Sequence, residues 1–272
     1  MKEQIKEMYL NGETKRNIIK KFNLGNYTRL NYILNELGVL KEKTNNNKIE
    51  INDDIFDSID TEEKAYLLGF LSSDGYILND GRTIGIALKR EDRYILEKFK
   101  EILEYKGEIK DYDAVTTYGQ TSYSRLRFSS YKIYNFLKEF GFTNKKSYSF
   151  KPKVELINAE FYRDFLRGYF DGNCSIIIRI DKNNITRYQV SILGLKNIID
   201  LFTDYFKFEK EYYLDQRKEG CETLNIKFQK VKLVDKVLDG LYKDSNIYLK
   251  RKYERYINFK NTTYKKVVHI WW

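Results

Sequence analysis

Two stretches of nine residues repeat one another, and each carries an oxygen-bearing side chain where its helix should end. The first stretch, 67–75, contains Asp74, and the second, 166–174, contains Asn173 at the corresponding position 99 residues later. A carboxylate at the C-terminal end of a helix faces unpaired carbonyls and the negative end of the helix dipole. A bound cation would satisfy both, and Mg²⁺ prefers such oxygen ligands. Asp74 is therefore the first candidate metal ligand and Asn173 its partner, the alternative for Asp74 being a solvated acid at a helix end.

Small residues four apart predict how these two helices pack. Gly69 and Ser73 in the first stretch match Gly168 and Gly172 in the second, so each pair lies on one helix face. Pairs of this kind allow two helix backbones to approach closely. Such packing would bring the ends of both stretches together into one site. The backbone carbonyls of Ser73 and Gly172 would then complete the coordination shell of the metal.

Each stretch opens a unit in which the predicted elements follow the same order. The first unit continues with strands at 76–78 and 82–88, a helix at 92–103, strands at 107–113 and 122–129, and a helix at 131–140. The second continues with strands at 175–180 and 185–193, a helix at 195–205, strands at 211–216 and 221–228, and helices at 231–241 and 248–259. The predicted fold class is α+β, with two pseudo-symmetric αββαββα repeats of antiparallel strands.

A small helical module is predicted at 1–40. Two short helices, a turn containing glycine and a third helix from about 26 to 37 form a helix-turn-helix pattern. In that motif the N-terminal residues of the last helix contact base edges in the major groove, which makes Asn26, Tyr27 and Arg29 candidates for DNA contact. The alternative is a three-helix module that binds protein. Residues 41–54 read as a flexible linker, 55–151 as the first repeat and 152–272 as the second.

On these residues the chain resembles the LAGLIDADG homing endonucleases, in the form in which one chain carries both motifs. Matching segments after each repeat, 145–148 and 251–253, add to the resemblance. It implies two antiparallel sheets that form a saddle over the DNA major groove. It also implies cleavage of both strands of a long site with Mg²⁺ and one acid from each motif. By the family's pattern, Lys146 and Lys252 approach the scissile phosphate, the alternative being generic phosphate contacts.

The second motif departs from the family's pattern at two positions. Asn173 replaces the expected acid and Cys174 replaces the glycine after it, whereas Asp74 and Gly75 keep both residues in the first motif. An amide offers a metal one oxygen but no charge. This departure puts cleavage in question and leaves the fold and DNA binding in place.

Polar side chains that alternate along the predicted strands are the candidates for base contacts, because arginine suits guanine and glutamine suits adenine. These candidates are Arg82, Lys89, Arg125, Arg127, Arg179, Arg187, Gln189, Arg217 and Lys227. Which of them face DNA depends on strand register, since a slip of one residue inverts the faces.

Composition narrows the function classes. The 272 residues carry a formal net charge of +10, which favours a polyanionic partner. One histidine argues against histidine-based nucleases, and two distant cysteines argue against a zinc site or a disulfide framework. No apolar run is long enough to span a bilayer and no signal peptide is evident. We expect an intracellular, cytoplasmic protein, associated with the nucleoid, without a membrane or obligate protein partner.

The leading prediction is therefore a monomeric protein that binds double-stranded DNA sequence-specifically. Two hypotheses remain open within it: an endonuclease that cuts or nicks DNA with Mg²⁺, and a transcriptional regulator that kept the fold and lost the chemistry. An RNA-splicing maturase of the same fold is a minor third.

Overall fold

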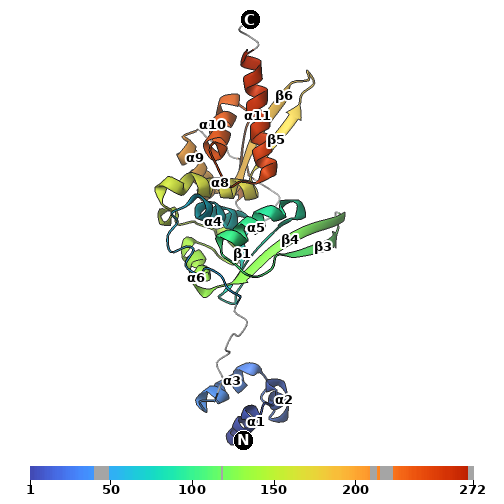
Figure 1. Cartoon of the computed structure of the whole chain (residues 1–272), viewed down its shortest axis with the longest axis vertical. Helices are drawn as coiled ribbons and strands as arrows, with labels where there is room; N and C mark the ends of the chain where they lie inside the picture. The colour runs from blue at the N-terminus through green and yellow to red at the C-terminus, as the bar shows by residue number, and fades with distance from the viewer. Residues whose placement is uncertain (40–48, 118, 209–212, 215–222, 269–272) are drawn as a thin grey trace. The chain divides into compact units, whose positions relative to one another are not determined.

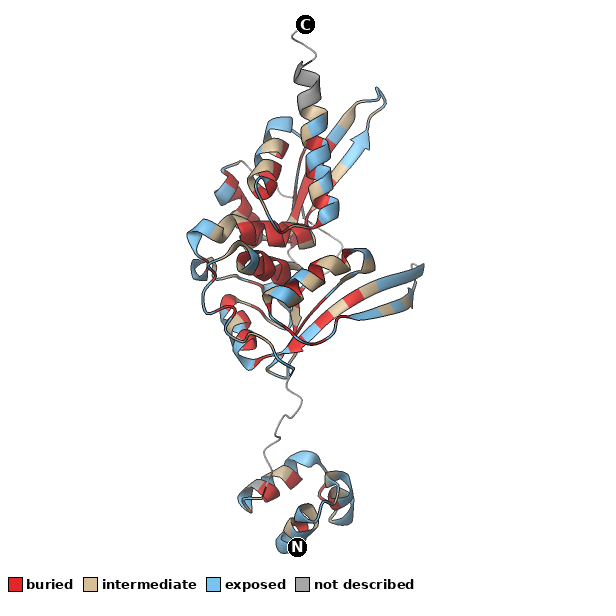
Figure 2. Ribbon diagram, in the orientation of Figure 1, coloured by how far each residue is buried: buried red, intermediate tan, exposed pale blue. Residues whose placement is uncertain are grey.

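The two repeated stretches form helices α4 (Glu62–Asp74) and α8 (Tyr162–Asn173), which lie side by side in the computed structural model (Figure 1). The side chain of Thr61 accepts a hydrogen bond from the backbone N–H of Lys64 at 3.3 Å and so caps α4. Most residues of both helices are buried (Figure 2). The pair therefore forms the centre of the unit rather than part of its surface.

Glycine makes the close approach of α4 and α8 possible. A Cβ atom built on Gly69 would lie 2.0 Å from the carbonyl oxygen of Phe165, and one on Gly168 would lie 2.1 Å from that of Tyr66. Both distances are far below van der Waals contact, so no larger residue fits without moving a helix backbone. The small residues four apart thus act as the sequence predicts.

The structure describes residues 1–39, 49–117, 119–208, 213–214 and 223–268, and the chain divides into two units, Met1–Lys48 and Ile49–Trp272. Residues 49–54 of the predicted linker belong to the second unit. The backbone N–H of Asn52 donates to the carbonyl of Leu103, and that of Lys106 donates to the carbonyl of Glu50. The larger unit therefore begins before the predicted boundary at residue 55.

Two four-stranded antiparallel sheets flank the helix pair with matching topology. The first has the order β1-β2-β4-β3 and the second β5-β6-β8-β7. Their strands are β1 (Tyr76–Ile77), β2 (Thr83–Lys89), β3 (Lys110–Thr116), β4 (Gly119–Ser129), β5 (Ser175–Ile180), β6 (Thr186–Leu195), β7 (Tyr213–Leu214) and β8 (Thr223–Phe228). The predicted α+β class with two pseudo-symmetric repeats is confirmed.

The remaining helices of this unit are α5 (Arg93–Ile102), α6 (Tyr131–Phe140), α7 (Lys146–Ser149), α9 (Lys196–Phe206), α10 (Val231–Tyr242) and α11 (Lys250–Val268), with short 3₁₀ turns at Arg90–Asp92, Val154–Leu156 and Ala159–Phe161. One hydrophobic core runs through both repeats. Helix α11 continues well past the predicted end at 259. Most of the predicted strand at 211–216, the first two residues of the predicted strand at 221–228, and residues 269–272 lie outside the described residues.

Burial along the strands fixes which side chains face the helices. In β4, Leu126 and Phe128 are buried in the core, whereas Arg125 and Arg127 lie on the opposite side. In β6 and β8, Val190, Ile192 and Ile226 likewise belong to the core. We call the side of each sheet turned away from this core its outer face.

The small unit contains α1 (Lys2–Leu10), α2 (Lys15–Lys21) and α3 (Tyr27–Glu36), close to the predicted helices. Its own core consists of Ile5, Ile18, Leu24, Leu30, Ile33 and Leu34. The Thr14 side chain caps α2 by accepting from the backbone N–H of Asn17. Each element is short, and the unit depends on packing these few apolar side chains together.

The helix contact gives a stability prediction. Gly168→Ala adds a Cβ against the backbone of α4, which cannot yield as a side chain can, so we expect a loss of about 2 kcal/mol in the free energy of unfolding, in the range usual for overpacked cores. Gly240→Ala is the matched control, because its Cβ would meet only the ring of Phe206. Urea unfolding of both variants measures this, and equal effects would contradict the proposed backbone constraint.

Candidate nucleic-acid interface and metal site

The C-terminal ends of α4 and α8 meet, as predicted. A Cβ atom built on Gly172 would lie 2.5 Å from Oδ2 of Asp74 and 1.7 Å from Oγ of Ser73. The carboxylate of Asp74 therefore reaches across to the backbone of the other motif helix. Only a glycine at 172 leaves room for it, which ties the close packing of the helices directly to the position of the acid.

Asp74 is exposed as a residue, but the surrounding protein desolvates its carboxyl group. Surrounding protein atoms raise the pKa of its carboxyl by desolvation, while the charges of Lys146, Lys252 and Arg251 and a hydrogen bond from Ser73 act to lower it. The Ser73 hydroxyl donates to Asp74 Oδ2 at 3.3 Å and, more closely, to the carbonyl of Phe70 at 2.8 Å. Desolvation therefore disfavours the charged form of this carboxyl, and a bound cation would favour it.

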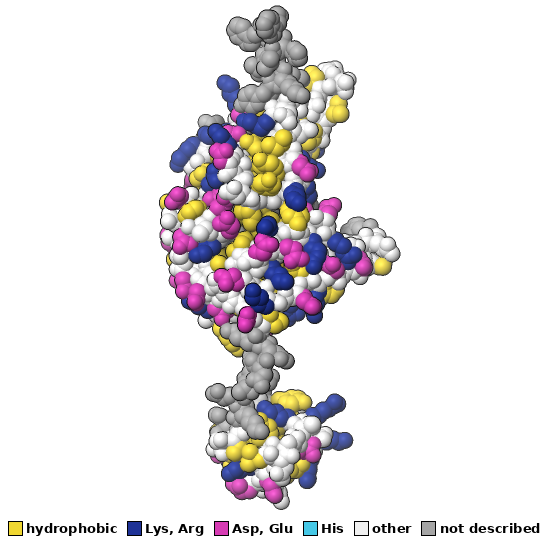
Figure 3. All heavy atoms as spheres, viewed as in Figure 1, with side chains coloured by type: hydrophobic (Ala, Val, Ile, Leu, Met, Phe, Trp, Pro, Cys, Tyr) yellow, Lys and Arg dark blue, Asp and Glu magenta, His cyan; other side chains and the backbone are white. Residues whose placement is uncertain are grey.

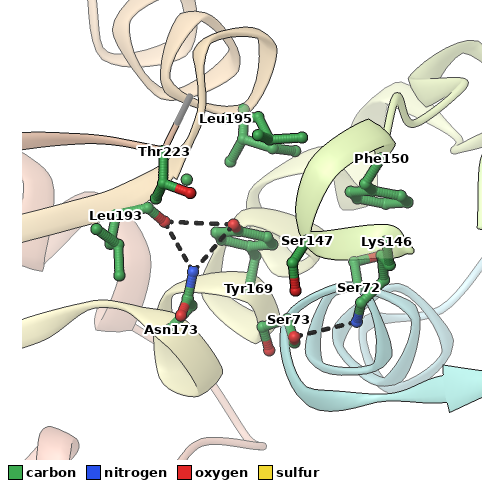
Figure 4. Close-up of a pocket in the computed structure, with 12 residues that line it drawn as sticks. Ser72, Ser73, Lys146, Ser147, Phe150, Tyr169, Asn173, Leu193, Leu195 and Thr223 are labelled. Carbon is green, nitrogen blue, oxygen red and sulfur yellow. Dashed lines mark hydrogen bonds between the residues drawn. The ribbon is translucent and has the colours of Figure 1, made fainter. Parts of the chain in front are cut away.

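Asn173 is oriented differently from Asp74. Its amide nitrogen donates to the carbonyl of Leu193 at 3.0 Å and to the hydroxyl of Tyr169 at 3.2 Å, so the side chain is tied to β6 (Figure 4). A carboxylate has no proton to donate to Leu193. The asparagine therefore makes a contact that the acid of a complete motif could not make.

Lys146 and Lys252 occupy corresponding places and cap the two motif helices. Lys146 Nζ donates to the carbonyls of Leu71 at 2.7 Å and Ser73 at 3.0 Å. Lys252 Nζ donates to the carbonyls of Phe170 at 2.6 Å, Asp171 at 2.7 Å and Cys174 at 2.5 Å. Each ammonium thus satisfies carbonyls that a helix end leaves unpaired.

Lys252 is the more buried of the two lysines, with only 3% of its surface exposed. Burial lowers the pKa of its ammonium to about 8, against the opposing influence of Asp171, Cys174 and Asp74. Three carbonyl acceptors hold the charged form in place, but its head group has little room to reach a ligand. This geometry supports a role in positioning α8.

Mg²⁺ is bound by oxygen ligands, and the helix ends offer several candidates for this role. Among the described residues no cluster of three or more His, Cys, Asp and Glu could hold a metal. Asp74 supplies one carboxylate, and the carbonyl of Ser73, a predicted ligand, already accepts from Lys146. Asp74 fits a single hard cation whose other ligands are water or a bound substrate. The other predicted ligands, the carbonyl of Gly172 and the side-chain oxygen of Asn173, are neutral oxygens at the end of α8.

Strand register places most of the predicted DNA-contacting residues on the outer faces. In the first sheet this face carries Tyr76, Thr83, Gly85, Ala87, Lys89, Lys110, Tyr112, Ala114, Thr121, Tyr123, Arg125, Arg127 and Ser129. In the second it carries Ser175, Ile177, Arg179, Arg187, Gln189, Ser191, Leu193, Leu195, Thr223, Asn225 and Lys227. Arg82 precedes β2 and is exposed, and Arg217 lies outside the described residues.

The outer faces are basic in both sheets. None of the described residues in these two sets is acidic, whereas Lys and Arg are interspersed with Asp and Glu on the face of the larger unit drawn in Figure 3. Lys110, opposite Arg125 in the pairing of β3 with β4, was missed by the sequence reasoning. Its alternation with Tyr112 is the signal that would have found it.

Three of the residues predicted to contact DNA interact with other side chains of the protein. Arg125 lies over the ring of Tyr112, 4.4 Å from its centroid, and Tyr112 in turn stacks on Tyr123. Gln189 is buried and accepts from Gln229 at 2.9 Å. Arg187 pairs with Asp181. Arg125 is thus pre-oriented, while Gln189 is the least accessible of the predicted contacts.

A buried polar network on the other side of α8 was also missed. Arg167 is fully buried and bonds Asp164 at 2.7 Å and Glu62 at 2.6 Å, which links the two motif helices. Asp171 accepts from the hydroxyls of Tyr66 and Tyr242. The spacing 164, 167 and 171 puts these charged residues on one helix face, and this was the available signal.

In the small unit, Asn26 caps α3, since its Oδ1 accepts from the backbone N–H of Arg29 at 3.0 Å. Tyr27 and Arg29 are exposed, as predicted. No acidic residue occurs from 14 to 35, a span that contains Lys15, Arg16, Lys20, Lys21 and Arg29. The α2–α3 segment is therefore basic, which is compatible with a polyanionic ligand.

The pKa of Asp74 gives a pH-dependent prediction. A carboxyl whose pKa is raised by folding destabilises the folded state as pH rises above about 4, the value for an unfolded chain. Asp74→Asn should therefore raise the melting temperature at pH 7, and the difference should vanish towards pH 3. Added Mg²⁺ should stabilise the wild type more than this variant.

Asp80 is the matched control with the opposite sign. Hydrogen bonds from the Thr83 hydroxyl and backbone lower the pKa of its carboxyl to about 2. Asp80→Asn should therefore lower the melting temperature above pH 4 and lose this effect towards pH 2. Thermal unfolding across this pH range measures both variants, and a destabilised Asp74→Asn at pH 7 would contradict the desolvation of Asp74.

The larger unit is similar to known proteins in sequence and in fold. Residues 61–141 match the family model of a LAGLIDADG-like domain. The crystal structure of the I-LtrWI LAGLIDADG homing endonuclease bound to target DNA aligns with a TM-score of 0.51 and 10% identity over 75% of this chain and 91% of that chain. A lysine-to-alanine mutant of I-SmaMI aligns with a TM-score of 0.50 and 12% identity over 75% and 90%. No curated protein matches the sequence.

Within the described residues no helix combines the length and apolar character needed to cross a membrane. The family match covers the first repeat, and the structural matches extend the likeness to both. Residues 61–141 therefore resemble a LAGLIDADG-like domain in sequence, and the larger unit of this chain has the fold of the LAGLIDADG homing endonucleases.

Proposed function

We propose that the protein binds double-stranded DNA across the outer faces of its two sheets and, with Mg²⁺, cuts one strand at Asp74. The observation that carries this proposal is the asymmetry of the helix ends. Asp74 presents a desolvated carboxylate, whereas the amide nitrogen of Asn173 donates hydrogen bonds to the carbonyl of Leu193 and the hydroxyl of Tyr169. The two halves of the fold are thus equivalent in architecture and unequal in chemistry.

DNA binding is supported by charge and by likeness. The outer faces carry Lys89, Lys110, Arg125 and Arg127 in one sheet and Arg179, Arg187 and Lys227 in the other, with no described acid among them. Lysine and arginine provide the phosphate contacts that dominate affinity for a duplex. The I-LtrWI endonuclease, with the same fold, is described as bound to target DNA.

Two repeats in one chain already supply both halves of a pseudo-twofold surface, so we expect a monomer to bind. Arg125, held over Tyr112, is pre-oriented for the bidentate contact that arginine makes with guanine. Arg127 lies opposite Gly85, where the strand offers no competing side chain. These two residues are our strongest candidates for base recognition.

The chemistry assigned to each residue at the helix ends follows from its contacts. Asp74 would hold the metal, which when bound supplies charge stabilisation at the phosphate and activation of water. Lys146 and Lys252 hold the ends of α4 and α8 through their carbonyls. Their contacts support positioning of the site over direct contact with the scissile phosphate. The tight packing of Gly172 excludes other side chains from the space beside Asp74.

A second candidate is a regulator that binds DNA without cutting it. The observation in its favour is again Asn173, since its bond to the Leu193 carbonyl is one that a catalytic carboxylate cannot make. The added small unit, with its basic α2–α3 segment, suits such a protein as well. The two candidates differ in whether Asp74 alone sustains cleavage.

Cleavage of a plasmid that carries the bound site separates them. We expect the wild type with Mg²⁺ to nick the plasmid without linearising it, and Asp74→Asn to abolish nicking. Asn173→Asp cannot donate to Leu193, so its carboxylate should turn towards Asp74 and restore the second ligand. This variant should lose stability without metal through carboxylate repulsion, regain it with Mg²⁺, and linearise the plasmid.

Asn158→Asp is the matched control, since an aspartate there can still accept from the backbone N–H of Glu160 and adds the same charge elsewhere. Linearisation by the wild type as fast as by Asn173→Asp would show that the asymmetry is unimportant. Binding without any cleavage, in both proteins, would favour the regulator.

The small unit gives a separate prediction. Removing residues 1–48 leaves the core of the larger unit intact, because that core contains no residue before Ile55. We expect the truncated protein to fold, to bind DNA more weakly and to protect a shorter footprint at one end, since a tethered second DNA contact raises affinity. DNase I footprinting and thermal unfolding measure this. An unchanged footprint would assign the small unit to another partner.

A further inference from the structure

The first turn of α11 makes three consecutive contacts with other elements. Lys250 donates its backbone N–H to the hydroxyl of Tyr94 and places its Nζ 4.4 Å from the centroid of that ring. Arg251 Nε donates to Asp92 Oδ2 at 3.1 Å. Lys252 caps α8. These contacts join the second repeat to the first, and Lys252 places them beside the end of α8.

Asp92 is unusual for a residue at a helix start. It occupies the N-cap position of α5, where an aspartate ordinarily accepts from the backbone N–H groups of its own helix, yet its side chain makes no such bond. Only 4% of its surface is exposed. The buried carboxylate faces Arg251 instead, and the 3₁₀ turn at Arg90–Asp92 leads directly into α5.

Only part of the Arg251 guanidinium is used by this pair. Asp92 accepts from Nε, and 46% of the arginine side chain remains exposed. Among the described residues, its two terminal nitrogens have no acceptor. Arginine presents its donors as a rigid fork that suits phosphate oxygens. The bond to Asp92 therefore fixes the guanidinium while leaving its terminal N–H groups for a ligand.

Arg251 directly precedes Lys252, which caps α8, and the Asp74 carboxylate reaches the backbone of α8 at Gly172. Its positive charge contributes to lowering the pKa of Asp74, alongside the charges of Lys146 and Lys252. The ammonium groups of those lysines donate hydrogen bonds to backbone carbonyls at the helix ends. Of the three cations that act on Asp74, Arg251 is the most exposed.

The other half of the molecule lacks this arrangement. Lys145 precedes Lys146 as Arg251 precedes Lys252, but the N-cap residue of α9 is Leu195, which cannot pair with a cation. In place of an ion pair there is a cavity of about 400 Å³, which Leu195, Lys146 and Asn173 help to line (Figure 4). The fixed arginine belongs to the second repeat, whose motif helix ends at Asn173, whereas its partner Asp92 belongs to the first repeat.

We propose that Arg251 binds a backbone phosphate of the DNA strand that lies at Asp74, and that Asp92 is the positioning residue that holds its guanidinium. This inference rests on the proposed DNA binding and adds a strand-specific contact to it. It joins Arg251 of the second repeat to Asp92 of the first, and no corresponding ion pair is made by Leu195 at the start of α9.

The salt dependence of binding tests the proposal on a duplex selected with the wild-type protein. Arg251→Gln should reduce the slope of log affinity against log salt by about 0.9 and weaken binding about tenfold at 0.1 M salt, because one phosphate contact is lost. Arg251→Lys should retain most of the slope. Lys98→Gln is the control, since it removes an equal charge from an exposed position on α5.

Asp92→Asn should weaken binding less than Arg251→Gln does, and combining the two changes should add nothing to Arg251→Gln alone, as expected for coupled residues. Ethylation interference should lose one phosphate, on one strand, in Arg251→Gln. A purely structural ion pair would instead lower the melting temperature and leave the salt slope unchanged, which would overturn the inference. Failure of the wild type to bind any duplex would overturn the proposed function as well.

Discussion

The larger unit depends on one contact, the approach of α4 to α8 with no side chain between their backbones. Cβ atoms at Gly69, Gly168 or Gly172 would each overlap atoms of the opposite helix. Because the helices cross at these points, the crossing determines where both C-termini lie and where each sheet begins. β1 starts two residues after Asp74 and β5 starts two residues after Asn173. The outer faces are therefore positioned by the same contact that positions the candidate site.

Bringing two helix ends together concentrates unpaired carbonyls, and the fold compensates for this with cations that are costly to bury. Lys252 is almost fully enclosed, and its pKa is lowered to about 8 for that reason. Arg167, equally buried, joins Glu62 of the first helix to Asp164 of the second. Breaking such a buried pair leaves an uncompensated charge, so these contacts make the helix arrangement specific even where an apolar residue would be more stabilising. Asp74 stands apart, because its desolvation has no matching salt bridge among the described residues.

The architecture could be predicted because it follows from local patterns. Small residues four apart predict the helix contact, alternation predicts the strands, and their order gives the two repeats. Register could not be predicted for the strands until burial showed that Arg125 and Leu126 face opposite sides. The roles of Lys146, Lys252 and Arg251 could not be predicted either, because their partners lie from 73 to 159 residues away along the chain. The orientation of Asn173 depends on a single carbonyl, that of Leu193, which no sequence pattern identifies.

The substitutions that distinguish the halves are physically related. Because Asn173 bonds to β6, the end of α8 presents no carboxylate, although Lys252 still caps its carbonyls. Leu195 stands at the start of α9 where Asp92 stands at the start of α5, and a cavity lies beside it. At the end of α4 the carboxylate of Asp74 remains, and Asp92 holds the guanidinium of Arg251. The twofold arrangement depends on the helix contact, which does not require charge, so the two halves can differ in their charged residues while they keep the same architecture.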